Sequence, residues 1–212
     1  MASRSAPAPS PGSGRAQQRE ATRERLIEGA LACFERKSYL ATTVEDILEE
    51  AGAGRATFYA HFTGKGALLI SALGDLDPIV DASYERLNSQ LNRRGELSRA
   101  QLHAWLTGWA DEWERYAVLL RAAWQAATSD PGIHRRNLEV EARITELLTH
   151  YLERYQGASR ERARMRSVLL QMMSERAFYT MISSIDFDRE QALEVLSEFW
   201  WSVLSEGDQS VE

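Results

Sequence analysis

A short stretch of the chain that follows a glycine turn carries polar side chains suited to reaching a DNA duplex. They are Arg55, Thr57, Tyr59 and His61. On a helix that begins near Arg55, Phe58 and Phe62 are four residues apart and pack inward, so the polar residues fall largely on other faces. An arginine there can bond as a fork to O6 and N7 of a guanine, and such a pair contributes on the order of 1 to 3 kcal/mol of discrimination between bases.

Two short helices separated by glycines must position these side chains. Thr43 is a cap residue before a helix predicted over residues 44–51, because its hydroxyl can accept a bond from an early backbone N–H. Gly52 and Gly54 then interrupt the pattern, and a third helix follows over residues 55–62. An amphipathic helix over residues 17–37 precedes them. This arrangement is typical of a helix-turn-helix domain, which projects one helix into the major groove.

As a set, these motifs resemble the TetR (tetracycline-repressor) family over roughly residues 20–70. The matching motifs are Thr42-Thr43-Val44-Glu45-Asp46-Ile47, Ala51-Gly52, Thr57-Phe58-Tyr59, His61-Phe62 and Lys65 with Leu68-Leu69. The resemblance implies a DNA-binding N-terminal domain followed by a helical domain that binds a ligand and dimerises.

The resemblance also implies individual roles. It places Gly54, Arg55 and Thr57 at base edges, where Gly54 offers only its backbone. It places four further residues at phosphates, namely Thr43, Tyr59, His61 and Lys65. The alternative for the arginine, histidine and lysine is plain solvated surface, and the alternative for the tyrosine is a half-buried packing role.

Charge and composition exclude several classes of protein. The formal charge is −6, and acidic and basic residues cancel over residues 15–65, so the acidic excess follows Lys65. This charge argues against a protein that coats nucleic acid indiscriminately, and DNA contact must depend on a few placed donors. The single cysteine, Cys33, lies in an apolar run, which rules out an intramolecular disulfide or a cysteine zinc cluster and favours a buried hydrophobe. We expect no metal and no cofactor.

The patterning predicts an all-α fold of about nine helices, since sustained period-two alternation is missing. The domains expected are a disordered Ala/Ser/Pro/Gly-rich tail over residues 1–16, a helix-turn-helix domain over 17–64 and a helical ligand-binding and dimerisation domain over 65–208. Pro78 predicts a kink or break near residues 74–78. Ser98 with Gln101, Asp130 with Pro131, and Asp188 with Gln191 predict helix starts. With neither a signal segment nor a membrane span in the pattern, we expect a cytoplasmic protein.

Aromatic residues accumulate in the second domain. Trp105, Trp109 and Trp113 stand four apart on one helix, which indicates either core or the wall of a pocket. So many indoles are difficult to pack into a small core, which favours a cavity for a hydrophobic ligand. The expected ligand-contacting residues are Trp105, Trp109, Trp113, Trp124, Gln171, Ser174, Phe178 and Trp200, with Met165, Met172, Met173 and Met181 as adaptable walls.

Residues 170–178 and 198–201 are similar to the corresponding helices of the mycobacterial ethionamide-resistance repressor branch of the family. That similarity implies that Gln171 and Ser174 offer polar contacts in a long apolar channel and that Trp200 closes one wall. For Glu175 and Arg176 a structural ion pair or solvated surface is the preferred interpretation.

A single helix-turn-helix reads one half-site, so useful affinity requires a homodimer on a pseudo-palindromic operator. The family resemblance places the interface on the last two helices, where Leu193, Leu196 and Val203 are interface candidates; packing within the chain is an equal alternative. The function indicated is a repressor released by a small hydrophobic ligand. The alternatives are an activator, a nucleoid-type protein, or an all-helical enzyme or small-molecule-binding protein without specific DNA binding.

The pattern offers no catalytic residues. The four histidines form no H-E-x-x-H pair, and the sequence contains neither a G-x-S-x-G elbow nor a glycine-rich phosphate loop. We therefore expect a protein that is not an enzyme.

Overall fold

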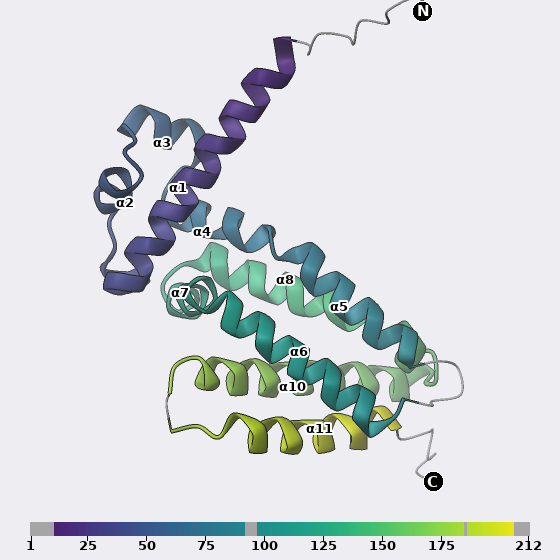
Figure 1. The fold of residues 1–212 in the computed structure, drawn as a ribbon. Helices are drawn as coiled ribbons and strands as arrows, with labels where there is room; N and C mark the ends of the chain where they lie inside the picture. The colour runs from purple at the N-terminus through teal and green to yellow at the C-terminus, as the bar shows by residue number, and fades with distance from the viewer. Residues whose placement is uncertain (1–10, 92–96, 185, 206–212) are drawn as a thin grey trace, which may run out of the picture. The chain divides into compact units, whose positions relative to one another are not determined.

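Helices are the one kind of regular secondary structure in the computed structural model, which describes residues 11–91, 97–184 and 186–205 (Figure 1). The predicted all-α class is confirmed. The chain divides into two compact units, Met1–Leu69 and Ile70–Glu212. Within the described ranges, no helix is both long and apolar enough to cross a lipid bilayer.

The first unit contains α1 (Pro11–Ala41), α2 (Val44–Glu50), α3 (Arg55–His61) and the first residues of α4 (Lys65–Gly74). Its core is apolar and includes Leu26, Ala30, Ile47, Phe58 and Leu68, none of them exposed. Helices α1 and α2 approach closely beside Gly29, where an added Cβ would lie 3.0 Å from the Cβ of Ala51. Any larger side chain on α1 there would therefore push the two helices apart.

Helix α1 begins at Pro11 and not at Gln17, so residues 11–16, which the composition predicts to be disordered, are helical. Proline is favoured at a first helical position, where its missing N–H has no partner to lose, and the residues from Arg15 onward are mostly good helix formers, although Gly12 and Gly14 are not. Residues 1–10 of the predicted tail lie outside the described residues. At Ser38 the backbone leaves helical geometry with φ 70° and ψ 162°, one residue after the predicted helix end, and a last turn then reaches Ala41.

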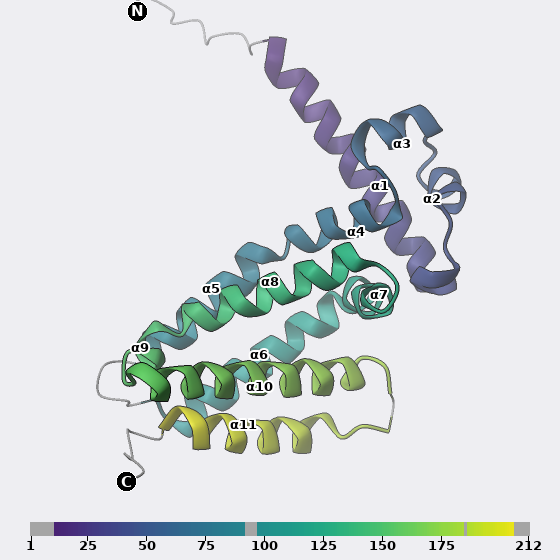
Figure 2. The same cartoon turned by 180° about the vertical axis from the view of Figure 1, so that it is seen from behind.

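The second unit contains the end of α4 and seven further helices. They are α5 (Asp77–Gln90), α6 (Arg99–Arg115), α7 (Ala117–Ala127), α8 (Pro131–Leu147), α9 (Thr149–Leu152), α10 (Gly157–Met181) and α11 (Arg189–Ser205). Helix α6 packs against α11, while α8 packs against α5, α7 and α10. Figure 2 shows α10 and α11 side by side, with α6 next to them.

The described residues form eleven helices where the sequence predicts about nine. One extra helix arises because the kink or break predicted near Pro78 is a full break, with Pro78 in the first turn of α5. The other arises at Leu148, where the backbone leaves helical geometry and separates α9 from α8. The caps are as predicted: Ser98 and Gln101 form a capping box, and the Asp130 carboxylate accepts from the first turn of α8.

Candidate functional site

Helix α2 starts with a reciprocal cap that orients the helix-turn-helix. The Thr43 hydroxyl accepts from the Asp46 backbone N–H at 3.2 Å, and the Asp46 carboxylate accepts from the Thr43 N–H at 2.9 Å. Lys37 at the end of the long helix α1 donates to the same carboxylate at 2.5 Å. The Lys37 bond, followed by the two Thr43 bonds, lowers the pKa of Asp46 to about 2. The start of α2 is therefore tied to α1 by charge as well as by packing.

The turn between α2 and α3 depends on one glycine conformation. Gly52 has φ +57°, a value that side-chain-bearing residues adopt only with strain, and it ends α2 in the left-handed manner. Gly54 then takes extended geometry as the N-cap of α3. Phe58 is fully buried, and its ring lies 5.8 Å from that of Phe62. These two rings hold α3 against the rest of the first unit.

The predicted base-contacting face of α3 is open to solvent. The side chain of Arg55 is 67% exposed and forms an ion pair with Glu45. Tyr59 is 54% exposed, with its ring edge-on to Phe58. Thr57 and His61 are half-buried. An exposed ion pair of this kind contributes little to stability, so the guanidinium can be redirected at low free-energy cost.

Lys65 is more enclosed than a free phosphate-binding lysine. Its Nζ donates to the carbonyl oxygens of Tyr39 and Thr42, both at 2.7 Å, and lies 4.2 Å from the centre of the Tyr39 ring. Partial burial lowers the pKa of its ammonium group. Lys65 thus caps the end of α1, with one N–H left for an outside acceptor.

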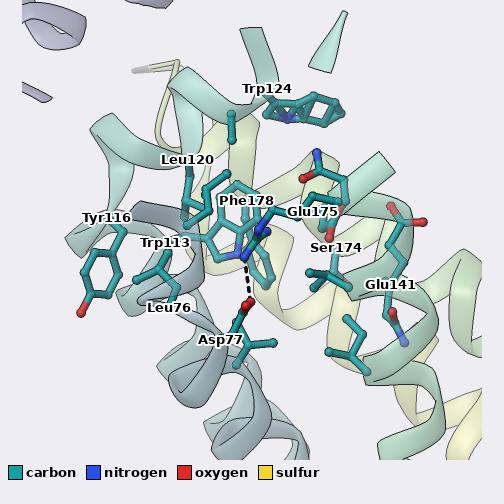
Figure 3. Close-up of a pocket in the computed structure, with 18 of the residues that line it drawn as sticks. Leu76, Asp77, Trp113, Tyr116, Leu120, Trp124, Glu141, Ser174, Glu175 and Phe178 are labelled. Carbon is teal, nitrogen blue, oxygen red and sulfur yellow. Dashed lines mark hydrogen bonds and ion pairs between the residues drawn. The ribbon is translucent and has the colours of Figure 1, made fainter. Parts of the chain in front are cut away.

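A cavity of about 320 Å³ lies within the second unit, between α5, α6, α7, α8, α10 and the end of α4. Its walls are mostly apolar and aromatic. They include Leu73, Leu76, Tyr84, Trp109, Trp113, Tyr116, Leu120, Trp124, Ile144 and Phe178. Figure 3 shows Trp113 and Phe178 close together at its centre, and their rings are 5.8 Å apart.

Six of the eight predicted ligand-contacting residues line this cavity. They are Trp109, Trp113, Trp124, Gln171, Ser174 and Phe178. Trp105 and Trp200 do not line it. Both are buried in the core with their rings 5.2 Å apart, and each indole N–H already has a partner, Trp105 at the Ser83 carbonyl and Trp200 at the Ser174 hydroxyl. Of the predicted methionine walls, Met172 alone lines the cavity.

Sequence reasoning missed the acidic groups of the cavity. Glu112, Glu141 and Glu175 all line it. Burial, and secondarily the charge of Glu141, raises the pKa of Glu175 to about 7; burial also raises the pKa of Glu141. Glu175 is half-buried in the cavity wall and forms no ion pair with Arg176. Arg176 is exposed, as the solvated-surface interpretation expects, and its guanidinium lies 5.7 Å from the centre of the Trp124 ring. Helical spacing was the available signal, because residues 171, 174, 175 and 178 share one face.

Large apolar side chains are exposed on both of the last two helices. They are Met165, Leu169 and Met172 on α10, and Val195 and Phe199 on α11. We call these five residues the α10/α11 face. The interface candidates Leu193 and Leu196 are instead buried within the chain, at 2% and 4% exposure, and Val203 packs against the same core. For these three residues, packing within the chain is the alternative that holds.

The geometry of the two units is characteristic of one class of protein. A capped α2, a glycine turn and an exposed α3 on a buried hydrophobic anchor form a helix-turn-helix unit, followed by a separate helical unit that encloses a cavity. In the described part of the chain, no group of three or more His, Cys, Asp or Glu is placed to hold a metal ion. The class is that of helix-turn-helix transcriptional regulators.

Comparisons with known proteins identify the family within this class. The sequence model for bacterial regulatory proteins of the tetR family matches residues 26–72. The HTH-type transcriptional regulator YerO of Bacillus subtilis is 42% identical over 50 residues, which are 24% of this chain and 17% of YerO. The HTH-type transcriptional activator FasR of Mycolicibacterium smegmatis is 24% identical over 189 residues, 88% of this chain and 84% of FasR.

The fold agrees with these matches. A TetR-family transcriptional regulator from Syntrophomonas wolfei aligns with a TM-score of 0.70 at 16% identity, over 91% of this chain and 99% of that chain. Residues 26–72 therefore carry the DNA-binding domain of tetR-family regulatory proteins, and the chain shares the fold of a TetR-family transcriptional regulator.

Proposed function

We propose that the protein binds a pseudo-palindromic DNA operator as a homodimer and that a small, largely hydrophobic molecule in the second unit controls this binding. The observation that carries the proposal is the exposure of Arg55 and Tyr59 on α3, beside a fully buried Phe58 that fixes the helix. Arg55, Thr57 and the Gly54 backbone meet base edges in the major groove. Four residues contact phosphates, namely Thr43, Tyr59, His61 and Lys65.

The α10/α11 face supports the homodimer. Its five apolar side chains would remain in water in a monomer, and exposed large apolar side chains gathered on two neighbouring helices are typical of an interface. A two-fold dimer presents two copies of α3, which meet successive half-sites when they are about 34 to 36 Å apart, or a multiple of that distance.

The cavity supports control by a ligand. A molecule bound there shifts DNA affinity only through a difference in its own affinity for the DNA-binding and the free conformations. We propose repression relieved by the ligand as the main function, with no catalytic step, in the bacterial cytoplasm where the operator lies. Activation is the second candidate, because the relative FasR, similar over most of the chain, is named an activator.

The test starts from random duplex oligonucleotides selected for binding to the purified full-length protein. The expected result is an inverted repeat. Arg55→Ala should weaken binding to the selected sequence by about tenfold or more and relax the choice of base at one position in each half-site. Arg86→Ala, at an exposed arginine on α5, is the matched control and should bind as the wild type does.

Failure to enrich any sequence, or an unchanged affinity in Arg55→Ala, would contradict the proposal. Thermal unfolding separates this result from misfolding, because the exposed Arg55–Glu45 pair contributes less than about 1 kcal/mol to stability. Transcription in vitro from a promoter that carries the selected sequence then separates repression from activation.

A further inference from the structure

The charged groups of the cavity are mainly acidic. They are Asp77, Glu112, His134, Arg136, Glu141 and Glu175. The arginine is already engaged, since Arg136 bonds Asp77 at 2.7 Å. The cavity wall therefore has more carboxylates than positively charged side chains to pair with them.

Two of the carboxylates lack partners. Among the described residues, neither Glu141 nor Glu175 forms a hydrogen bond or an ion pair through its side chain; His134 acts on Glu141 only as a nearby charge. In Figure 3 both side chains lie on the same side of the cavity, beside Ser174. Both side chains are half-buried. Partly desolvated carboxylates without a partner, in the wall of a cavity, are typical of a place where a partner binds.

An amide acceptor adds to this arrangement. Gln171 is 1% exposed, and its Nε2 donates to the Thr145 hydroxyl at 3.2 Å, while its Oε1 is buried without a partner. Glu112 has one such oxygen too, Oε2. The only unpartnered buried donor on the described cavity wall is the indole Nε1 of Trp124. Most of the unpartnered polar atoms in the cavity wall are therefore hydrogen-bond acceptors, and a ligand that binds there must supply hydrogen-bond donors.

The rest of the wall fits a cation that carries an apolar body. Trp109, Trp113, Trp124 and Phe178 present ring systems, and ring faces attract ammonium groups more strongly when water is excluded. A volume of about 320 Å³ is at the lower end of the range for small-molecule sites.

We infer that this cavity binds a lipophilic monocation, a protonated amine on an aromatic or alicyclic body, with its ammonium group held between the carboxylates of Glu141 and Glu175. The Gln171 Oε1 accepts a further hydrogen bond from the ligand. The inference rests on the proposed ligand site and assigns its chemical class. Because desolvation raises the pKa of Glu175 to about 7, cation binding favours the ionised form and releases protons below that pH.

The test compares three probes with one aromatic body, namely 4-phenylbutylamine, 4-phenylbutan-1-ol and 4-phenylbutyrate. Binding to the full-length protein at pH 8 is followed by calorimetry and by the fluorescence of the cavity tryptophans. The amine should bind about tenfold more tightly than the alcohol, the difference expected between a charge-assisted and a neutral hydrogen bond. The carboxylate should bind most weakly.

Charge-removing variants identify the residues. Glu175→Gln and Glu141→Gln should each reduce the preference for the amine over the alcohol, and the double variant should abolish it. Glu139→Gln, at an exposed glutamate on α8 outside the cavity, should keep the full preference. The amine should also bind more weakly at pH 6 than at pH 8 in the wild type, because Glu175 is then mostly protonated.

Several outcomes would overturn the inference: equal or tighter binding of the alcohol or the carboxylate, no binding of any probe, or an unchanged preference in the double variant. Operator binding is measured on the same preparations. Intact operator binding without a preference for the amine overturns the cation assignment alone, whereas loss of sequence-selective DNA binding overturns the proposed function.

Discussion

The indole Nε1 of Trp200 donates a hydrogen bond of 2.8 Å to the hydroxyl oxygen of Ser174, which joins α11 to α10 in the interior of the second unit. The Ser174 hydroxyl in turn donates to the Leu170 carbonyl oxygen at 2.8 Å. Trp200 is fully buried and Ser174 is 4% exposed, so water replaces neither bond.

We therefore expect Ser174→Ala to lower the free energy of unfolding by about 1 to 3 kcal/mol, because it leaves a buried indole N–H without an acceptor. Urea unfolding at fixed protein concentration measures the change. Ser202→Ala, at an exposed serine on α11, should have little effect. In a Trp200→Phe background the cost of Ser174→Ala should shrink; an equal cost there would show that the bond is not its source.

Local features of the fold are predictable from the sequence because their causes lie within a few residues. Thr43, Ser98 and Asp130 are caps in the structure as in the sequence pattern, since a side-chain oxygen needs only a nearby N–H of the first turn. Gly52 ends α2 for the same local reason. The all-α class follows from a periodicity that continues along the chain.

The cavity was only partly predictable because it depends on which helices meet. Trp105 and Trp113 occupy one stripe, yet Trp105 packs against Tyr84 and Trp200 while Trp113 lines the cavity. Sequence periodicity predicts which face of a helix is apolar, but it does not predict which other helix packs against that face at each turn. The inward position of Glu175 follows from the helix face that it shares with Gln171 and Phe178, but residue type points the other way, because glutamates rarely face the interior without a partner.

Ser38 adopts φ 70° and ψ 162°, a region occupied almost only by glycine. We expect Ser38→Gly to stabilise the protein by about 1 kcal/mol, because relieved strain of about 1 to 3 kcal/mol exceeds the added unfolded-state entropy of glycine. Differential scanning calorimetry measures the shift. Ser89→Gly within α5 should be destabilising by about 1 kcal/mol, and a loss of similar size in Ser38→Gly would rule out the strain.

If the α10/α11 face is the dimer interface, a charged side chain placed on it should dissociate the dimer. Leu169 on α10 is 57% exposed, so Leu169→Asp should leave each chain folded while placing a charge in the interface. Sedimentation velocity should show a shift from dimer to monomer, with operator affinity reduced in parallel. Leu138→Asp is the control for oligomeric state alone, because Leu138 is 51% exposed on α8, outside this face, but also lines the cavity. A dimer that persists in Leu169→Asp and dissociates in Leu138→Asp would move the interface to α8.

Glu175 predicts an unusual pH dependence of stability. Burial raises the pKa of its carboxyl group from 4.5 to about 7, so between these values the folded chain holds a proton that the unfolded chain has lost. The free energy of unfolding contributed by this group therefore falls as pH rises from about 4.5 to 7 and levels off above.

Glu175→Gln removes this dependence. The variant should be more stable than the wild type by on the order of 1 to 3 kcal/mol at pH 8, and nearly equal to it at pH 5. Urea unfolding at pH 5, 6, 7 and 8 tests this, with Glu139→Gln as the exposed control. A constant difference across the pH range would show that the carboxylate is not desolvated. If it is desolvated, a cation that pairs with it should raise the melting temperature more at pH 8 than at pH 5, because only the ionised carboxylate is available to it.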